Sequence, residues 1–115
     1  MYVLMFTQDG LADVKALPKN VKNSLKKELQ QKVAIDPYGC SIELEEPLKG
    51  WRSFHWRNYR IVFKVYDDAK AVAIAGVGVR LPRSKSDIYR KLETLASEGK
   101  LAENILRLLR GFSSK

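Results

Sequence analysis

The chain has 115 residues, which is enough for one compact domain and too few for a second full core. Hydrophobic residues make up 45% and charged residues 30%, a balance that excludes a disordered or low-complexity protein. No apolar stretch approaches the about 18 residues of a membrane span, so we expect a cytoplasmic protein that contacts no membrane. With only Cys40 and one histidine, the sequence predicts no disulfide, no metal and no cofactor.

Charge is distributed unevenly along the chain, with a net value of +8 from 21 basic and 13 acidic residues. Residues 1–50 carry seven basic and seven acidic groups, residues 51–92 carry ten and three, and residues 93–115 carry four and three. A concentrated basic block favours a polyanionic partner and indicates a phosphate-binding face. The alternative is a solvated surface with no partner.

The first third of the chain predicts one strand and two helices. Residues 2–7 are β-branched and aromatic and end at a Gln-Asp-Gly sequence, which is typical of a strand followed by a turn or helix cap. Residues 11–17 and 18–35 have helical spacing. This helical hairpin is too short to close a core alone, so we expect it to pack on a sheet. The apolar stripe of its second helix comprises Val21, Leu25, Leu29 and Val33.

The remainder of the chain predicts a sheet and then helix. Residues 36–50 are acidic and loop-like. The three β-rich runs that follow, at 51–57, 59–66 and 71–79, predict an antiparallel meander, and helical spacing returns after Pro82. The order β-α-α-β-β-β-α indicates an α+β fold, with helices on one face of a small antiparallel-dominated sheet and the other face potentially open.

Strand alternation collects cations and one imidazole on the open face. If Phe54 and Trp56 face the core, their neighbours face outward. In the next run Ile61 and Phe63 face the core by the same rule. The outward set comprises Ser53, His55, Arg57, Arg60, Val62 and Lys64.

Gly76 and Gly78 share the parity of Arg80 in the last run. Two missing side chains there would let a ligand approach the backbone beside Arg80, unless a bulge breaks the parity. Guanidinium groups match phosphate oxygens with forked donors. Cleavage of RNA through the 2'-hydroxyl needs a base, stabilised charge and a proton for the leaving oxygen, none of which requires a metal. The pattern indicates phosphodiester recognition, with or without cleavage.

Several short motifs occur in order along the chain: Leu-Pro-Lys at 17–19, Asp-Pro at 36–37, Asn-Tyr-Arg at 58–60, Gly-Val-Arg at 78–80 and Ile-Tyr-Arg at 88–90. Together they resemble the RelE/ParE superfamily, the toxins of bacterial type II toxin-antitoxin pairs. The resemblance implies a small curved sheet against two helices and a cognate antitoxin that wraps the toxin. It also implies contact with operator DNA only through the antitoxin complex. In the RelE branch it implies cleavage of messenger RNA in the ribosomal A site.

The resemblance also assigns roles to single residues. Arg60 and Arg80 fall on positions that support the scissile phosphate, and Tyr89 resembles a tyrosine that stacks on or orients a base. The lysines of the family's second strand have no counterpart between residues 50 and 59. His55 is therefore the candidate general base, because a neutral imidazole accepts a proton near pH 7. The cations expected to bind substrate are Arg52, Arg57, Lys64, Arg83 and Lys85.

Each assignment has a structural alternative. His55 could be an outward strand residue with a local hydrogen bond, either arginine a salt-bridge partner, and Tyr89 a packing residue. Trp51 and Trp56 are interpreted as core or rim aromatics rather than stacking platforms. The lysines of the second helix are interpreted as a solvated face.

Three functions remain open at the level of sequence. The first is a ribosome-dependent messenger RNA endoribonuclease that inhibits translation. The second is a ParE-like, non-catalytic inhibitor of DNA gyrase, and the third is an inactive member that only binds its antitoxin. We expect one domain over residues 1–115, in which residues 100–115 form a helical extension that packs on the core, mediates a dimer or exchanges with an antitoxin helix.

Overall fold

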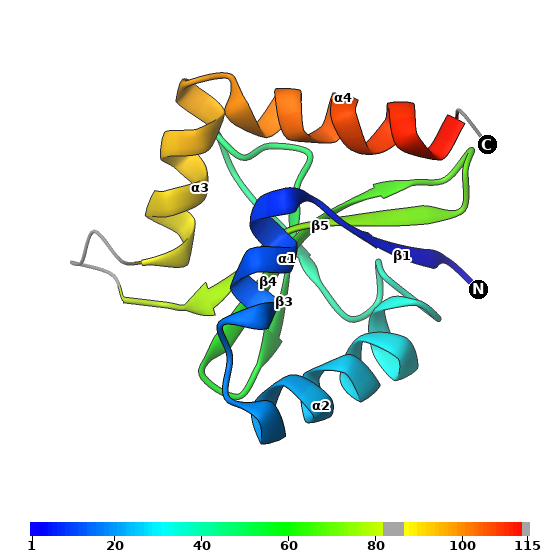
Figure 1. Ribbon diagram of the computed structural model, residues 1–115, viewed down its shortest axis with the longest axis vertical. Helices are drawn as coiled ribbons and strands as arrows, with labels where there is room; N and C mark the ends of the chain where they lie inside the picture. Colours follow the sequence, from blue (N-terminus) through cyan, green and yellow to red (C-terminus); the bar gives the residue numbers. More distant parts are fainter. Residues whose placement is uncertain (82–86, 114–115) are drawn as a thin grey trace.

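A five-stranded sheet runs through the centre of the molecule in the computed structural model, which describes residues 1–81 and 87–113 (Figure 1). The strand order is β1-β5-β4-β3-β2, with β1 parallel to β5 and the other neighbours antiparallel. The strands are β1 (Val3–Phe6), β2 (Ile42–Glu43), β3 (Arg52–Trp56), β4 (Tyr59–Tyr66) and β5 (Ala71–Val79). The predicted meander and the α+β class are confirmed.

Helices lie before and after the run of strands. The helical segments are α1 (Gln8–Lys15), α2 (Lys19–Glu28), the π-helical turn η1 (Leu29–Val33), α3 (Ile88–Ser97) and α4 (Lys100–Ser113). Thr7 caps α1 by accepting a hydrogen bond from the Gly10 N–H at 3.0 Å. Among the described residues, no helix has the length and apolar composition needed to cross a bilayer.

The first face of the sheet packs on α1, α2 and η1. The stripe predicted for the second helix is buried at Leu25, Leu29 and Val33, against Phe63 and Ile74 of the sheet. Steps of four residues drift about 40° per step around an α-helix. The wider π-helical turn reduces this drift. Its hydrogen bond runs from the Ala34 N–H to the Leu29 carbonyl, five residues earlier, at 2.9 Å. The stripe therefore stays on the sheet to its end.

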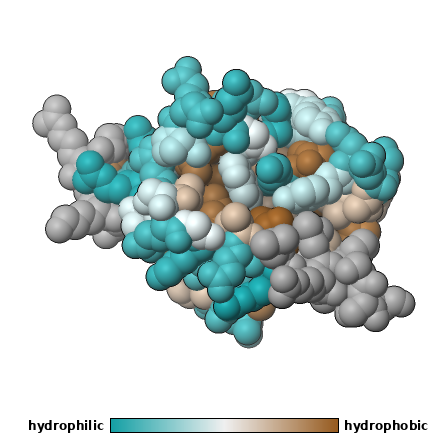
Figure 2. Space-filling model, turned by 90° about the horizontal axis from the view of Figure 1, so that it is seen from above, coloured by the Kyte–Doolittle hydropathy of each residue, from teal (hydrophilic) through white to brown (hydrophobic). Residues whose placement is uncertain are grey.

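The second face of the sheet was predicted to be open, and this prediction is wrong. Ile88 and Leu92 of α3 and Leu101 and Ile105 of α4 pack on it in a second core cluster. The turn at Gly99, where φ is 74°, lets the apolar sides of α3 and α4 pack on the same face. Figure 2 shows the molecule from the α4 side, where hydrophobic residues appear in hollows between hydrophilic ones.

The prediction that Gly76 and Gly78 leave room for a ligand is also wrong. A Cβ atom on either glycine would lie 3.2 Å from an atom of Ile88. The glycines let α3 approach the backbone of β5 closely, so the missing side chains serve helix packing.

A bulge in β5 changes its alternation, as the parity argument allowed. Val62 pairs with Gly76 and Phe63 with Ile74, so Ala75 has no partner in β4. Beyond this point β1 has ended, and α1 replaces it along β5. The Val77 N–H donates to the Asp13 carboxylate of α1 at 3.0 Å.

Strand β2 was not predicted, because residues 36–50 were interpreted as a loop. Ile42 and Glu43 are both exposed and pair with Ser53 and Arg52 at the sheet edge. A two-residue strand with no buried side chain has no hydrophobic pattern to identify it.

Candidate functional site

Two of the predicted catalytic residues lie side by side in the sheet. His55 of β3 pairs with Arg60 of β4, and Arg60 pairs in turn with Gly78 of β5. Alternation places both side chains on the second face, where α3 packs. The Arg60 guanidinium donates to the Tyr59 carbonyl at 3.0 Å and remains partly exposed.

Helix α3 brings Tyr89 to this pair. The Tyr89 hydroxyl lies 2.7 Å from the Ser53 hydroxyl and 3.5 Å from His55 Nε2, the latter at the long limit for a hydrogen bond. Ser53 is 1% exposed, so Tyr89 satisfies a buried hydroxyl. Sequence reasoning placed Ser53 outward but gave it no role. Ser53 lies two residues before His55 in the same strand, so alternation alone would have placed it on the same face.

Arg80 joins the group from the end of β5. Its guanidinium carbon lies 4.9 Å from the centroid of the Tyr89 ring, and Nη1 donates to the Asp87 carboxylate at 2.8 Å. Sequence reasoning missed Asp87. An aspartate directly before an apolar helical run is a helix-cap signal, and Asp87 does cap α3 by accepting from the Arg90 N–H.

The electrostatic setting of His55 favours its neutral form. Burial lowers the pKa of His55 below its ordinary value, and the positive charge of Arg60 lowers it further. The imidazole is therefore neutral at pH 7 and able to accept a proton.

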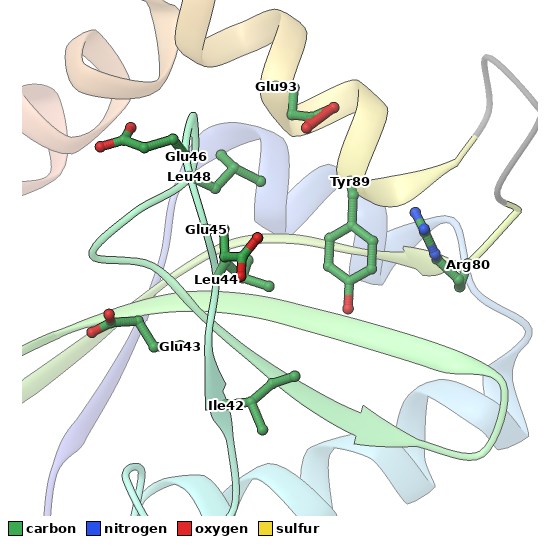
Figure 3. Close-up of a pocket in the computed structure, with 9 residues that line it drawn as sticks. All are labelled: Ile42, Glu43, Leu44, Glu45, Glu46, Leu48, Arg80, Tyr89 and Glu93. Atoms are coloured by element: carbon green, nitrogen blue, oxygen red, sulfur yellow. The ribbon is translucent and has the colours of Figure 1, made fainter.

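A pocket of about 420 Å³ opens beside Arg80 and Tyr89 (Figure 3). Its lining includes four carboxylates, from Glu43, Glu45, Glu46 and Glu93. In Figure 3 Glu93 lies on α3 above Tyr89, Glu43 is the last residue of β2, and Glu45 and Glu46 lie on the segment that follows β2. The surroundings of Arg80 are therefore of mixed charge, whereas the sequence predicted a basic face.

A smaller pocket of about 250 Å³ lies beside His55. His55 and Ser53 line it together with residues that precede or begin β2. Ile42 lines both pockets. Tyr89 therefore lines one pocket, and its hydrogen-bonding neighbours Ser53 and His55 line the other.

Two of the predicted substrate-binding arginines lie apart from this row. Arg52 faces the first side of the sheet and donates to the Ser41 hydroxyl at 2.7 Å and the Ser41 carbonyl at 3.1 Å, which fastens the segment before β2. Arg57 lies in the β3–β4 turn with φ 56°, and its guanidinium carbon is 4.3 Å from the centroid of the Trp56 ring.

The other predicted cations are not brought into the group either. Lys64 shares the face of Arg60 but lies about 13 Å further along β4, given the rise of a strand. Its ammonium is 5.7 Å from the Trp51 ring centroid, in a pocket lined by α4. Arg83 and Lys85 lie outside the described residues.

Both tryptophans have packing contacts. Trp51 is 8% exposed and belongs to the second core cluster, and the half-buried Trp56 stacks with Tyr59 at a centroid distance of 6.1 Å. These contacts agree with the interpretation of both as core or rim aromatics.

The group of His55, Arg60, Arg80 and Tyr89 offers a proton acceptor, two fixed positive charges, an aromatic ring and a hydroxyl. Two guanidinium groups and a neutral imidazole match a phosphodiester that reacts by proton transfer. His55 and Arg80 are exposed, and Arg60 and Tyr89 are partly exposed, so none of the four is fully buried.

Comparisons with known proteins give the chain a family. The model of the ParE toxin of type II toxin-antitoxin systems matches residues 4–81. A search of curated protein sequences finds no relative. Among solved structures, the RelBE2 toxin-antitoxin complex of Mycobacterium tuberculosis is similar with a TM-score of 0.66 and 23% identity, over 69% of this chain and 91% of that one.

Two further structures extend the similarity. The intact RelBE complex of E. coli has a TM-score of 0.57 and 26% identity, over 69% of this chain and 96% of that one. The YoeB/ParE toxin of Agrobacterium tumefaciens has a TM-score of 0.58 and 13% identity, over 69% of this chain and 99% of that one. The family match covers more than half of the chain and the fold agrees. The chain therefore belongs to the ParE toxin family of type II toxin-antitoxin systems, within the RelE/ParE superfamily.

Proposed function

We propose that this toxin is an endoribonuclease that cleaves messenger RNA on the ribosome and thereby inhibits translation. The observation that carries the proposal is the convergence of His55, Arg60 and Tyr89, with Arg80 stacked on the Tyr89 ring. These residues come from three separate elements and from the end of a strand, and three of the four are cationic or able to accept a proton. A purely structural surface has no need to gather them.

His55 acts as the general base in this proposal. It takes the proton of the ribose 2'-hydroxyl, and the 2'-oxygen then forms a bond to phosphorus while the bond from phosphorus to the 5'-oxygen breaks. The products are a 2',3'-cyclic phosphate and a 5'-hydroxyl end. Because arginine does not lose its proton in proteins, Arg80 stabilises the departing oxygen by hydrogen bonding and water supplies the proton.

Arg60 and Arg80 stabilise the charge that develops on the phosphorane. At an effective dielectric near 20, one cation about 4 Å from an oxyanion contributes roughly 4 kcal/mol. Arg60 lies in the sheet beside His55, and Arg80 contacts the Tyr89 ring, whose hydroxyl is 3.5 Å from His55 Nε2. In this proposal the scissile phosphate binds at the surface that these residues share, where the base and the two cations act on it.

A cognate antitoxin is the protein partner that we propose. Two of the similar structures are toxin-antitoxin complexes. Contact with operator DNA would occur only through the complex of the two proteins, and the proposed site of action is the cytoplasm.

The decisive experiment is primer extension on a defined messenger, translated in a purified bacterial system with and without the toxin. We expect cuts within codons at the ribosomal A site. Naked RNA and an Arg80→Ala variant serve as controls and should give none. Intact messenger and undiminished translation in the presence of the wild-type toxin would overturn the proposal.

Inhibition of DNA gyrase without catalysis is the second candidate function. The ParE family match and the four glutamates beside Arg80 favour it, since carboxylates repel a phosphate backbone. A toxin of this kind stabilises gyrase-DNA breaks and leaves RNA uncut. A gyrase cleavage assay run beside primer extension distinguishes the two functions, and inactivity in both assays would indicate a member that only binds its antitoxin.

A further inference from the structure

Asp87 accepts three hydrogen bonds, from two parts of the chain, through one carboxylate. Its side chain is 3% exposed. It accepts hydrogen bonds from the Arg80 guanidinium at 2.8 Å, from the Leu81 N–H, and from the Arg90 N–H at 3.3 Å. The end of β5 and the first turn of α3 are thereby joined at a single buried anion.

The geometry of Arg80 depends on this carboxylate. One end of the guanidinium is held by Asp87 and one face by the Tyr89 ring, and both of these residues lie in or directly before the first turn of α3. The family match ends at residue 81, before either of them. Helix α3 therefore adds two supports for Arg80 from outside the part of the chain that the family model matches.

We propose that Asp87 is a positioning residue that holds Arg80 in place for the reaction. This inference rests on the proposed ribonuclease function. An unrestrained arginine samples many rotamers, and ordering it during the reaction has an entropic cost. Asp87 orders the side chain before substrate arrives, so that Arg80 meets the phosphate in one orientation.

The same ion pair could instead neutralise Arg80 and block it, and three observations favour positioning. Asp87 engages Arg80 through Nη1, and a guanidinium has five N–H donors in all. The Arg80 side chain is 42% exposed, which leaves surface for a ligand. The carboxylate also accepts two backbone N–H groups, which balance part of its charge, and it is itself shielded from solvent.

Asp13 provides a matched control within the same chain. It is also a carboxylate that joins β5 to α3, accepting from the Val77 N–H at 3.0 Å and from the Lys91 ammonium at 2.6 Å. Asp13 has no contact with Arg80 among the hydrogen bonds and ion pairs of the described residues. If the aspartates only support α3, substitution of either one should lower activity by a similar amount. If Asp87 positions Arg80, only its substitution should do so.

The experiment compares Asp87→Asn and Asp87→Ser with Asp13→Asn. Asn and Ser both have side chains that can cap α3, so we expect both variants at residue 87 to fold. Thermal unfolding checks that they do. The first readout is the rate of messenger cleavage on translating ribosomes. The second is the NMR resonances of the Arg80 side chain, which the stacked Tyr89 ring shifts by its ring current.

We expect the rate to fall by about tenfold to a hundredfold in both Asp87 variants, with loss of the Arg80 ring-current shift. Asp13→Asn should retain both the rate and the shift. An Asp87 variant that cleaves as fast as the wild type, or faster, would overturn positioning, and a faster one would indicate a blocking contact. If the wild type cleaves no RNA, the ribonuclease function fails, and the ring-current shift alone decides whether Asp87 orders Arg80.

Discussion

The molecule has two cationic regions that differ in how their charges are held. Residues 15–32, around α2, carry six lysines and one glutamate, a net charge of +5. Five of these lysines are exposed, and none forms an ion pair within the part of the chain that the structure describes. In the site, by contrast, Arg80 is fixed by an ion pair and a stacked ring, and Arg60 by its own strand.

A region can therefore carry many positive charges without holding any of their side chains in a fixed position. The lysines of α2 produce a positive field but have no defined direction, since a flexible stem carries each ammonium. Arg80 lies among carboxylates, so the positive field around it is weaker, yet the guanidinium groups of Arg80 and Arg60 each have a defined orientation. Catalysis requires orientation, and long-range attraction requires only the field.

The largest effect should come from removing the restrained cations. Arg60→Ala and Arg80→Ala should each lower cleavage by about 100- to 1000-fold, because each removes a donor to the transition-state charge. Thermal unfolding of Arg60→Ala should change little, since that side chain is partly exposed. Arg80→Ala should unfold at a lower temperature than the wild type but remain folded, because it leaves the buried Asp87 carboxylate without its ion-pair partner. The measurement is cleavage rate in the translation system. Full activity in either variant would show that catalysis does not depend on that arginine.

His55 should set the dependence of cleavage on pH. The folded pKa of His55 lies below its ordinary value, so the rate should rise as pH increases through that lowered pKa and be level near pH 7. The same shift makes the folded state favour the neutral imidazole. Its contribution to stability is complete above pH 6.5 and lost as pH falls through the folded pKa.

The test is a pH–rate profile of the wild type and of His55→Gln. The variant should be about a hundredfold slower and lack the rise. An unchanged profile in the variant would show that another group is the base.

Tyr89→Phe should have a smaller effect. The variant keeps the ring under Arg80 but removes the hydroxyl that pairs with buried Ser53, so the free energy of unfolding should fall by about 1 kcal/mol. Cleavage should fall only severalfold if Tyr89 acts mainly through its ring. Denaturant unfolding and the cleavage rate are the measurements, with Tyr66→Phe at the other end of β4 as the control.

The smallest effect should come from the lysines. Lys26→Ala and Lys27→Ala together should change the free energy of unfolding by less than about 0.5 kcal/mol, since both side chains are exposed on a polar helix face. Cleavage of messenger should be unchanged at physiological salt. A folded double variant that no longer cleaves would mean that the lysines around α2 also contribute to ligand binding.

The strands were predictable where burial leaves a pattern. β4 and β5 have the predicted bounds, 59–66 and 71–79, because both runs are long and rich in β-branched residues. β2 left no such pattern. The cover on the second face was missed for a different reason: sequence periodicity shows that α3 and α4 have an apolar side, but not which surface it meets.

The site was predictable in the sheet and less so outside it. Alternation placed His55 and Arg60 on one face, as the structure does. Tyr89 was named from the resemblance, but its contacts to Ser53 and Arg80 depend on the docking of α3, which no local pattern encodes. The positive charge around α2 was also not apparent from the net charge of residues 1–50. Residues 36–49, with four carboxylates and one lysine, cancelled most of its charge in the total for residues 1–50.

The contact between Asp13 and β5 also bears on which edge of the sheet another chain could extend. β1 pairs with β5 only as far as Ile74, so the remainder of β5 has no neighbouring strand on that side. Such an edge invites strand addition by another chain. The Asp13 carboxylate occupies the Val77 N–H, and Gly10 lies so close that a Cβ would be 2.3 Å from the Ile74 carbonyl oxygen. Helix α1 thus covers this edge from Ile74 to Val77, where it occupies the place that an added strand would need.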